Sequence, residues 1–181
     1  YMEKELKSLD GILEGEVYVD DLHQKIYATD ASVYRKIPKG VAFPKSKEDL
    51  KKIIDFASKH KITLTPRTAG TSLAGQCVGE GLIVDVSKYF TSIVSYSKSL
   101  KTITVQPGVI RDDLNRFVKE DGVFFGPNTS TANRCMIGGM VGNNSSGTTS
   151  IRYGVTRDKV LSLETILSDG SEVVFKEVTK D

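Results

Sequence analysis

The residues best suited to chemistry lie in one stretch, from Pro127 to Gly154, which reads PNTSTANRCMIGGMVGNNSSGTTSIRYG. No carboxylate occurs from residue 122 to residue 157, although the chain contains 23 Asp and Glu among its 181 residues. Closely spaced glycines let backbone N–H groups approach a ligand, and positive charge is added by Arg134, Arg152 and Arg157. The stretch therefore predicts a site for a negatively charged, oxygen-rich ligand such as a phosphate.

A second carboxylate-free window runs from residue 56 to residue 79 and contains the loop RTAGTSLAGQCVG (67–79). Each window follows one half of the predicted architecture, so we expect the fold to bring the two together around one ligand. The alternative is a mobile glycine loop that binds nothing. Against it, apolar residues interleave with the glycines of the longer stretch, and solvated linkers seldom carry such anchors.

Two familiar phosphate loops do not fit these windows. Gly70 and Gly75 have the spacing of a Walker loop, but Gln76 and Cys77 stand where a lysine and a hydroxyl residue are required. The longer stretch contains only the last half of a Rossmann G-x-G-x-x-G pattern, without its first glycine or a matching acidic residue.

The sequence offers no metal site and no nucleophilic site. His23 and His60 are isolated, and neither window pairs a histidine with a serine or cysteine, as nucleophilic catalysis requires. Cys77 and Cys135 lack a metal-binding spacing, so we interpret them as small packing residues or free thiols near a site.

Composition and charge exclude several classes of protein. Hydrophobic residues make up 39% and charged residues 27% of the chain, which is typical of a globular protein. A net charge of +2, without a basic stripe, excludes nucleic acid as a main partner. No apolar run is long enough to span a bilayer. The start, YMEKELKSLDG, lacks the apolar core of an export signal, so we expect a cytoplasmic protein.

The first window is predicted to follow a strand–helix–strand unit. GVAFPKS (40–46) is typical of a strand, Ser46 with Asp49 is a plausible helix cap, and the helix is expected to end near His60. ITLTP (62–66) is the second strand, and the usual right-handed crossover makes the two strands parallel. Residues 1–40 are expected to form an outer arm with a short helix.

The second half predicts mainly antiparallel strands. LIVDV (82–86) is a third strand, SIVSY (92–96) and TITVQPG (102–108) are joined by a polar turn, and RDDLNRFVKEDG (111–122) is a short helix. Within that helix and its approach, one apolar face is expected from Ile110, Leu114, Phe117 and Val118. Asp169-Gly170, between two apolar runs, predicts a hairpin.

Five motifs, in order and with matching spacing over residues 40–175, resemble a known family. They are PRTAGTSLAG (66–75), LIVDVS (82–87), VQPGV (105–109), PNTSTANRCMIGGMVGNNSSG (127–147) and RYGVTRDKVLSLETILSDGSEV (152–173). Together they are similar to the flavin-binding domain of the vanillyl-alcohol oxidase or PCMH-type FAD-linked oxidases. The branch most alike holds D-lactate dehydrogenases, glycolate oxidase flavin subunits and D-2-hydroxyglutarate dehydrogenases.

The resemblance implies an α+β fold of two lobes: a small lobe with a parallel βαβ unit and a larger, mostly antiparallel lobe flanked by helices. It implies FAD as the cofactor, with a first loop that wraps the pyrophosphate, made of Pro66, Arg67, Thr68, Ala69, Gly70, Thr71 and Ser72. A second block is implied along the pyrophosphate, ribityl chain and flavin ring, made of Pro127, Asn128, Thr129, Ser130, Ile137, Gly138, Gly139, Asn144 and Gly147.

A few positions depart from the family pattern. Ala69 and Ser146 replace common glycines, and Met140 stands where asparagine is frequent, which affects individual contacts and not the cofactor. Thr71 occupies the place of a histidine that bonds covalently to the flavin in some relatives, so we expect non-covalent FAD. The Thr71 hydroxyl can instead bond its own backbone, alongside cofactor binding.

The resemblance further implies an oxidoreductase that moves a hydride from a small 2-hydroxy acid to FAD and passes electrons to a downstream acceptor. It divides the chain into an N-terminal arm (1–40) and an FAD-binding domain (41–181). The family's last glycine motif, its cap domain and its catalytic residues are expected beyond Asp181, so this piece alone is expected to be inactive. An iron–sulfur cluster, often present in longer relatives, would belong only to that following part.

Two alternatives stay open at this point. One is a non-catalytic nucleotide- or anion-binding module, which a reducible yellow cofactor would exclude. The other is a flavin reductase of sugar nucleotides on the same fold, although the RYG and TRD segments favour the hydroxy-acid branch.

Overall fold

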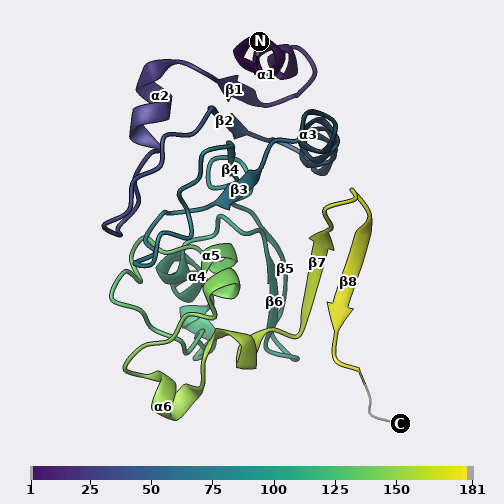
Figure 1. The fold of residues 1–181 in the computed structure, drawn as a ribbon. Coiled ribbons are helices and arrows are strands. Elements are labelled where there is room, and N and C mark those ends of the chain that lie inside the picture. The colour runs from purple at the N-terminus through teal and green to yellow at the C-terminus, as the bar shows by residue number, and fades with distance from the viewer. Residues whose placement is uncertain (1, 179–181) are drawn as a thin grey trace.

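The computed structural model describes residues 2–178 and shows two lobes joined along the chain (Figure 1). The N-terminal lobe contains a four-stranded sheet in the order β1-β2-β4-β3, made of β1 (Glu16–Tyr18), β2 (Gly40–Phe43), β4 (Leu82–Asp85) and β3 (Leu64–Arg67). β2 and β3 both run parallel to β4, as the strand–helix–strand pattern predicts. All four residues of β2 and of β4 are buried, so these strands form the centre of the lobe.

Three helices cover this sheet: α1 (Met2–Asp10), α2 (Asp21–Ile26) and α3 (Lys47–His60). The α3 helix begins and ends as expected. The Ser46 hydroxyl accepts the Asp49 N–H at 3.2 Å, and Lys61 closes the helix in the left-handed region with φ 53°. Ile53, Phe56 and Ala57 of α3 pack into the main core cluster together with Leu82 and Val84 of β4.

The first 40 residues pack against the rest of this lobe through α1 and β1. Leu6 and Leu9 of α1 are 0% and 1% exposed, and β1 pairs antiparallel with β2. The buried Asp49 carboxylate also accepts the backbone N–H groups of Glu14 and Gly15, both at 2.9 Å. A three-residue strand is too short to show an alternating pattern, which is why the sequence did not reveal it. A domain boundary at residue 40 stays a prediction.

The second lobe begins with the antiparallel hairpin of β5 (Ile93–Ser97) and β6 (Thr102–Val105), followed by α4 (Arg111–Val118) and the 3-10 turn η1 (Lys119–Asp121). Val109, Leu114 and Val118 form its core cluster. Phe117, expected on the buried face of α4, is 53% exposed and packs edge-on against the Tyr96 ring. The expectation for Phe117 is therefore wrong: its side chain lies at the edge of the helix face that Leu114 and Val118 bury, and more than half of it is exposed.

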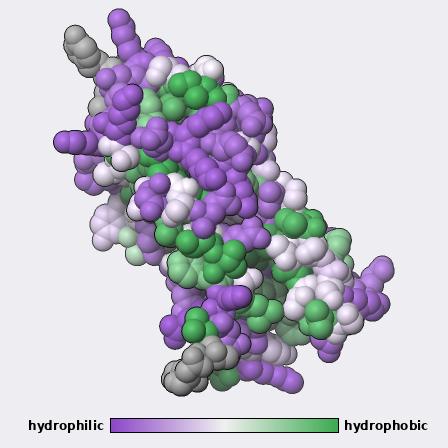
Figure 2. Space-filling model, turned by 90° about the vertical axis from the view of Figure 1, so that its right-hand side faces the viewer, coloured by the Kyte–Doolittle hydropathy of each residue, from purple (hydrophilic) through white to green (hydrophobic). Residues whose placement is uncertain are grey.

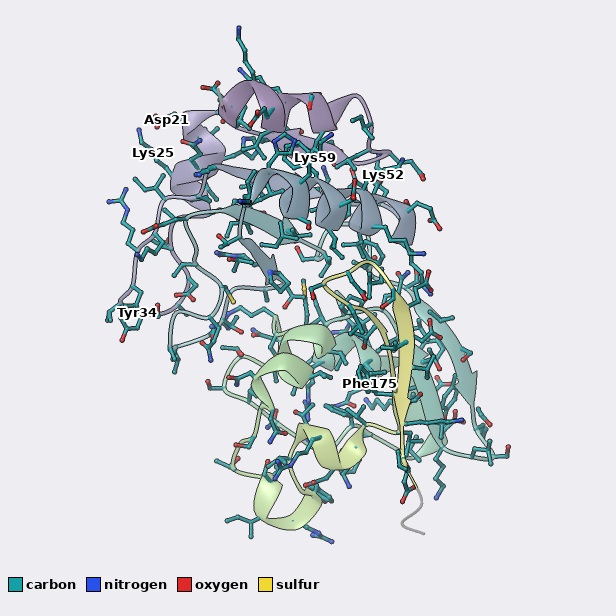
Figure 3. The ribbon with its side chains drawn as sticks, turned by 45° about the vertical axis from the view of Figure 1, so that its right-hand side comes forward. Asp21, Lys25, Tyr34, Lys52, Lys59 and Phe175 are labelled. Carbon is teal, nitrogen blue, oxygen red and sulfur yellow. The ribbon has the colours of Figure 1, made fainter. Side chains whose placement is uncertain are left out.

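A second hairpin, β7 (Ser162–Ile166) and β8 (Glu172–Lys176), lies beside β5 and β6 in Figure 1. Its turn at Asp169-Gly170 is confirmed, with Gly170 at φ 82°. In the described residues the two hairpins are separate two-stranded ladders. Figure 2 shows apolar surface on this side of the molecule, and Figure 3 marks Phe175 of β8, which is 55% exposed.

Between η1 and β7 the chain forms three further short helical segments: α5 (Ile137–Asn143), α6 (Ser150–Tyr153) and η2 (Thr156–Lys159). Thus the glycine-rich window is partly helical, which its sequence did not predict. No helix among the described residues is long and apolar enough to cross a membrane.

Candidate functional site

The first predicted loop leaves the carboxyl end of β3, beside the parallel strand β4. Gly70 has φ +67°, a conformation that glycine adopts without steric cost. A Cβ added at Gly70 would lie 2.5 Å from Nη2 of Arg67, so the guanidinium already fills that space. The backbone angle therefore favours glycine here, and any larger side chain would also have to displace the end of the Arg67 side chain.

The backbone donors of this loop are free of protein partners. Within residues 2–178, the N–H groups of residues 68–71 donate to no protein acceptor, and all four residues are half-buried. The N–H groups of residues 128–130 in the other window are likewise without a protein acceptor in the described chain. Such N–H groups are available to water or to a ligand, and the oxygens of a diphosphate would be suitable acceptors.

The start of α5 is fixed against the connection that follows β6. The N–H groups of Ile137 and Gly138 donate to the carbonyls of Val109 and Pro107, each at 2.9 Å. A Cβ on Gly138 would lie 2.4 Å from Cβ of Pro107 and 3.0 Å from its carbonyl oxygen. Gly138 therefore allows close backbone packing between the two segments.

The two carboxylate-free windows meet at the next residue. A Cβ on Gly139 would lie 2.6 Å from Oγ1 of Thr68, and the Gln76 side chain donates to Oδ1 of Asn143 at 3.0 Å. In Figure 1, α5 lies where the two lobes adjoin. The expectation that the fold brings both windows together is confirmed.

The remaining residues of the second block are also close to one another. Gly147 packs so tightly on Asn128 that an added Cβ would lie 1.5 Å from the Asn128 carbonyl oxygen. Asn144 ends α5 in the left-handed region with φ 47°, and its Oδ1 accepts the Arg157 N–H at 3.0 Å. Pro127 is buried, Thr129 contacts Cys135 at 3.3 Å, and Ser130 is exposed.

Not every predicted charge reaches the site. Arg134 and Arg152 are exposed; Arg134 donates to the neighbouring Asn133 side chain, and Arg152 lies over the Tyr153 ring. Positive charge near the first loop comes instead from Arg67. Among the described residues, no cluster of three or more His, Cys, Asp or Glu side chains could hold a metal ion.

Sequence reasoning missed Arg111, which supports the second block. Its guanidinium donates to the carbonyls of Pro127 at 3.1 Å and Phe125 at 3.2 Å, and it pairs with Asp112 at 2.8 Å. Only its place at the first turn of α4, directly after VQPGVI, could have marked it.

Sequence reasoning also missed a partly buried pair, Tyr27 and Asp85, whose tyrosine ring lies against Arg67 of the first loop. The Tyr27 hydroxyl donates to Oδ2 of Asp85 at 2.6 Å, and Asp85 is 3% exposed. Burial, followed by the neighbouring Asp85 carboxylate, raises the pKa of Tyr27 well above its usual range. A carboxylate at the end of the apolar strand LIVDV was the one signal for this pair.

These features together suit a nucleotide cofactor. Backbone N–H groups without protein acceptors in both windows and a meeting point between the lobes fit the diphosphate of such a cofactor. A two-lobed α+β domain of this kind is the class that FAD-linked oxidases share.

Comparison with family models gives the particular assignment. Residues 38–176 match the family described as "FAD binding domain", so this chain belongs to that family. Its cofactor is FAD, and the α+β fold with parallel and antiparallel sheets is confirmed.

Relatives of known name agree with this family. The chain is 38% identical over 160 residues to the D-2-hydroxyglutarate dehydrogenase of Haemophilus influenzae, covering 87% of this chain and 16% of that protein. It is 37% identical over 147 residues to the glycolate oxidase subunit GlcD of Bacillus subtilis, covering 80% of this chain and 31% of that protein. The chain thus spans less than a third of the length of either relative.

Solved structures share the fold at low identity. An alkyldihydroxyacetonephosphate synthase matches 97% of this chain and 38% of its own with a TM-score of 0.82 and 17% identity. The 6-hydroxy-D-nicotine oxidase of Arthrobacter nicotinovorans matches 91% of this chain and 36% of its own with a TM-score of 0.77 and 21% identity. One is named a synthase and the other an oxidase, so this fold alone does not define a reaction.

Proposed function

We propose that this chain is the FAD-binding part of a flavin-dependent dehydrogenase that oxidises a small 2-hydroxy acid. The observation that carries the proposal is the meeting of the two windows at Gly139 and Thr68, beside a first loop whose backbone donors at residues 68–71 have no protein acceptor among the described residues. FAD supplies the hydride-accepting chemistry when bound. The residues of this chain bind the cofactor and orient it.

The substrate class rests on the relatives. Those at 37% and 38% identity are named for glycolate and D-2-hydroxyglutarate, and a 32% identical relative from Saccharomyces cerevisiae is named a D-lactate dehydrogenase. These three compounds share a hydroxyl on the carbon next to a carboxylate. This common group supports a 2-hydroxy acid as substrate and leaves the rest of the molecule open.

In this proposal the described residues bind and orient FAD, and none of them transfers a proton. The relatives are much longer than the region that this chain matches. We place the catalytic base and the substrate-binding groups in a part of the enzyme that corresponds to their unmatched regions. Non-covalent attachment of FAD is proposed because Thr71 has no nucleophilic nitrogen. Acid denaturation should therefore release all of the flavin into the supernatant, and flavin retained by the precipitate would contradict this point.

The experiment is anaerobic flavin reduction in the holoenzyme. The purified protein should be yellow, and D-2-hydroxyglutarate, D-lactate or glycolate should bleach its visible flavin absorption band as the flavin is reduced. L-2-Hydroxyglutarate and L-lactate serve as controls for the two chiral acids. A flavin that dithionite bleaches but none of the acids reduces would contradict the substrate class. A colourless protein that binds no added FAD would favour the anion-binding module.

The electron acceptor and the cellular location are the finer parts of the proposal. We place the acceptor outside this chain, and the assay compares an artificial dye with cytochrome c and with oxygen under matched conditions. A cytoplasmic location stays a prediction, and cell fractionation followed by immunoblotting tests it.

A further inference from the structure

We propose that Arg67 is a positioning residue that fixes the shape of the first loop by donating hydrogen bonds to backbone carbonyls before and after it. In this proposal Arg67 is not itself a ligand of the FAD diphosphate. We call this unit the brace; it consists of Arg67, Asp85 and the segment 27–35, which begins with Tyr27. The inference rests on FAD binding at this loop and adds to it the device that fixes the shape of the loop.

The contacts of Arg67 join three parts of the chain. Its Nη1 donates to the Thr29 carbonyl at 2.9 Å and to the Cys77 carbonyl at 3.3 Å. Thr29 lies between β1 and β2, and Cys77 follows residues 66–72, so one side chain joins the two ends of the loop region to the N-terminal segment. The guanidinium carbon also lies 5.0 Å from the centre of the Tyr27 ring, within the range of a cation–π contact.

The loop rests directly on this brace. A Cβ on Gly70 would lie 2.5 Å from Nη2 of Arg67 and 3.0 Å from its Nε, so this edge of the guanidinium faces Gly70. The Gly70 carbonyl accepts the Ala31 N–H at 3.1 Å. Farther along, Gly75 lies against the ring of Tyr34, which Figure 3 shows on the outer loop of the N-terminal lobe. The N-terminal segment therefore touches the loop at several points.

The Tyr27–Asp85 pair anchors the brace in the sheet. Asp85 ends β4, and its carboxylate accepts the Tyr27 hydroxyl at 2.6 Å and the Ser87 N–H at 2.7 Å. Removing the hydroxyl would leave a buried carboxylate oxygen without its donor, which is costly. The ring beneath Arg67 is thus held by the same strand that pairs with β3, the strand on which Arg67 lies.

Arginine suits this role better than lysine. A planar guanidinium can bind two carbonyls at one edge while it stacks on an aromatic ring, whereas an ammonium is a compact charge that can do only one of these well. Tyr27, Thr29 and Ala31 all precede residue 38, where the family match begins. The brace therefore includes residues outside the matched domain.

The test measures the dissociation constant of FAD by the fluorescence of free flavin, in the holoenzyme and in variants freed of cofactor and titrated back. Arg67→Lys and Arg67→Met should both weaken FAD binding by about tenfold or more, and Tyr27→Phe by about threefold. The matched controls are Arg116→Lys and Arg116→Met, at an exposed arginine of α4 that pairs with Asp113. Their dissociation constants should stay within about twofold of wild type.

Two results would overturn the proposal. If Arg67→Lys keeps wild-type affinity while Arg67→Met loses it, positive charge alone is needed and Arg67 binds the diphosphate directly. The salt dependence decides the same point independently: the slope of log Kd against log salt should be equal in wild type and Arg67→Met, whereas a direct phosphate contact would make the variant's slope smaller.

The proposal can still be tested if the Arg67 variants do not fold. In that case Tyr27→Phe decides, because wild-type FAD affinity in a folded Tyr27→Phe variant overturns the brace. The outcomes also separate this inference from the proposed function. A wild-type protein that binds no FAD contradicts the cofactor site, whereas normal FAD binding in wild type and in every variant contradicts the brace alone.

Discussion

The two carboxylate-free windows look alike in sequence but use glycine for opposite purposes. In the first, Gly70 turns the chain at positive φ and its neighbours keep unpaired N–H groups. In the second, Gly138 and Gly147 let backbone segments pack at distances that no side chain would allow. The first window thus keeps backbone donors available among the described residues, whereas much of the second packs backbone against backbone.

Each window is also held by an arginine that binds backbone carbonyls. Arg67 binds the carbonyls of Thr29 and Cys77, and Arg111 binds those of Phe125 and Pro127. The difference lies in what is held: Arg67 supports a loop with free donors, whereas Arg111 joins α4 to a buried segment. Substitutions that separate cofactor affinity from stability will show whether this contrast is real.

The largest expected effect is on stability, at Gly147. Gly147→Val should lower the free energy of unfolding by about 3 kcal/mol or more, because the added Cβ would overlap the Asn128 carbonyl, which belongs to backbone and cannot swing away. Urea denaturation measures it. Gly142→Ala is the control: an added Cβ there meets nothing within 4 Å, so stability should stay within about 1 kcal/mol of wild type. Equal losses at both positions would break the contrast.

Gly70 should show the opposite behaviour. Gly70→Val combines an unsuitable backbone angle, which costs roughly 1–2 kcal/mol, with a collision against the Arg67 guanidinium. The displaced atoms end a side chain, so the protein should fold, while FAD affinity should fall by about a hundredfold or more as the loop shifts. Flavin content and circular dichroism test this. Equal flavin content in a folded variant would remove the first loop from the site.

Neighbouring glycines of α5 give the sharpest test. Gly138→Ala should lower stability by about 2 kcal/mol, because its Cβ would meet the Pro107 backbone. Gly139→Ala meets only the Thr68 hydroxyl, so stability should change by less than about 1 kcal/mol while FAD affinity falls several-fold. Gly139→Leu should lose flavin altogether with a normal circular dichroism spectrum. Global unfolding of the Gly139 variants would mean that this glycine also serves packing.

Local patterns predicted the strands and α3 well because their signals lie in contiguous residues. The buried runs GVAF and LIVD, the Ser46 cap and the Asp169-Gly170 turn are confirmed. Helix α5 was missed because two glycines in its first turn have low helix propensity, and hydrogen bonds to Pro107 and Val109 hold its start in place instead.

The candidate site was predicted in part. The sequence identified both windows, and the structure confirms that they meet, whereas the role of each residue toward FAD stays a prediction. The brace was out of reach, because Tyr27 and Asp85 are 58 residues apart and no periodic pattern links them. The sequence also could not distinguish a glycine that faces a ligand from one that faces Pro107, since both are simply glycine in a polar stretch.

The smallest expected effect is a pH dependence confined to the first window. Burial and then the Asp85 carboxylate raise the pKa of Tyr27, so the folded protein keeps this hydroxyl protonated at pH values where the unfolded chain, with a tyrosine pKa of about 10, releases the proton. The stabilisation is thus fully present below about pH 10 and is lost as the pH rises above it. Wild type should exceed Tyr27→Phe in free energy of unfolding by about 1 kcal/mol from pH 7 to 9, and the difference should shrink above pH 10. Flavin release, followed by fluorescence over the same pH range, should begin where the difference shrinks. A difference that stays constant to pH 11 would show that the hydroxyl bond does not support the loop, and the two windows would then differ only in their glycines.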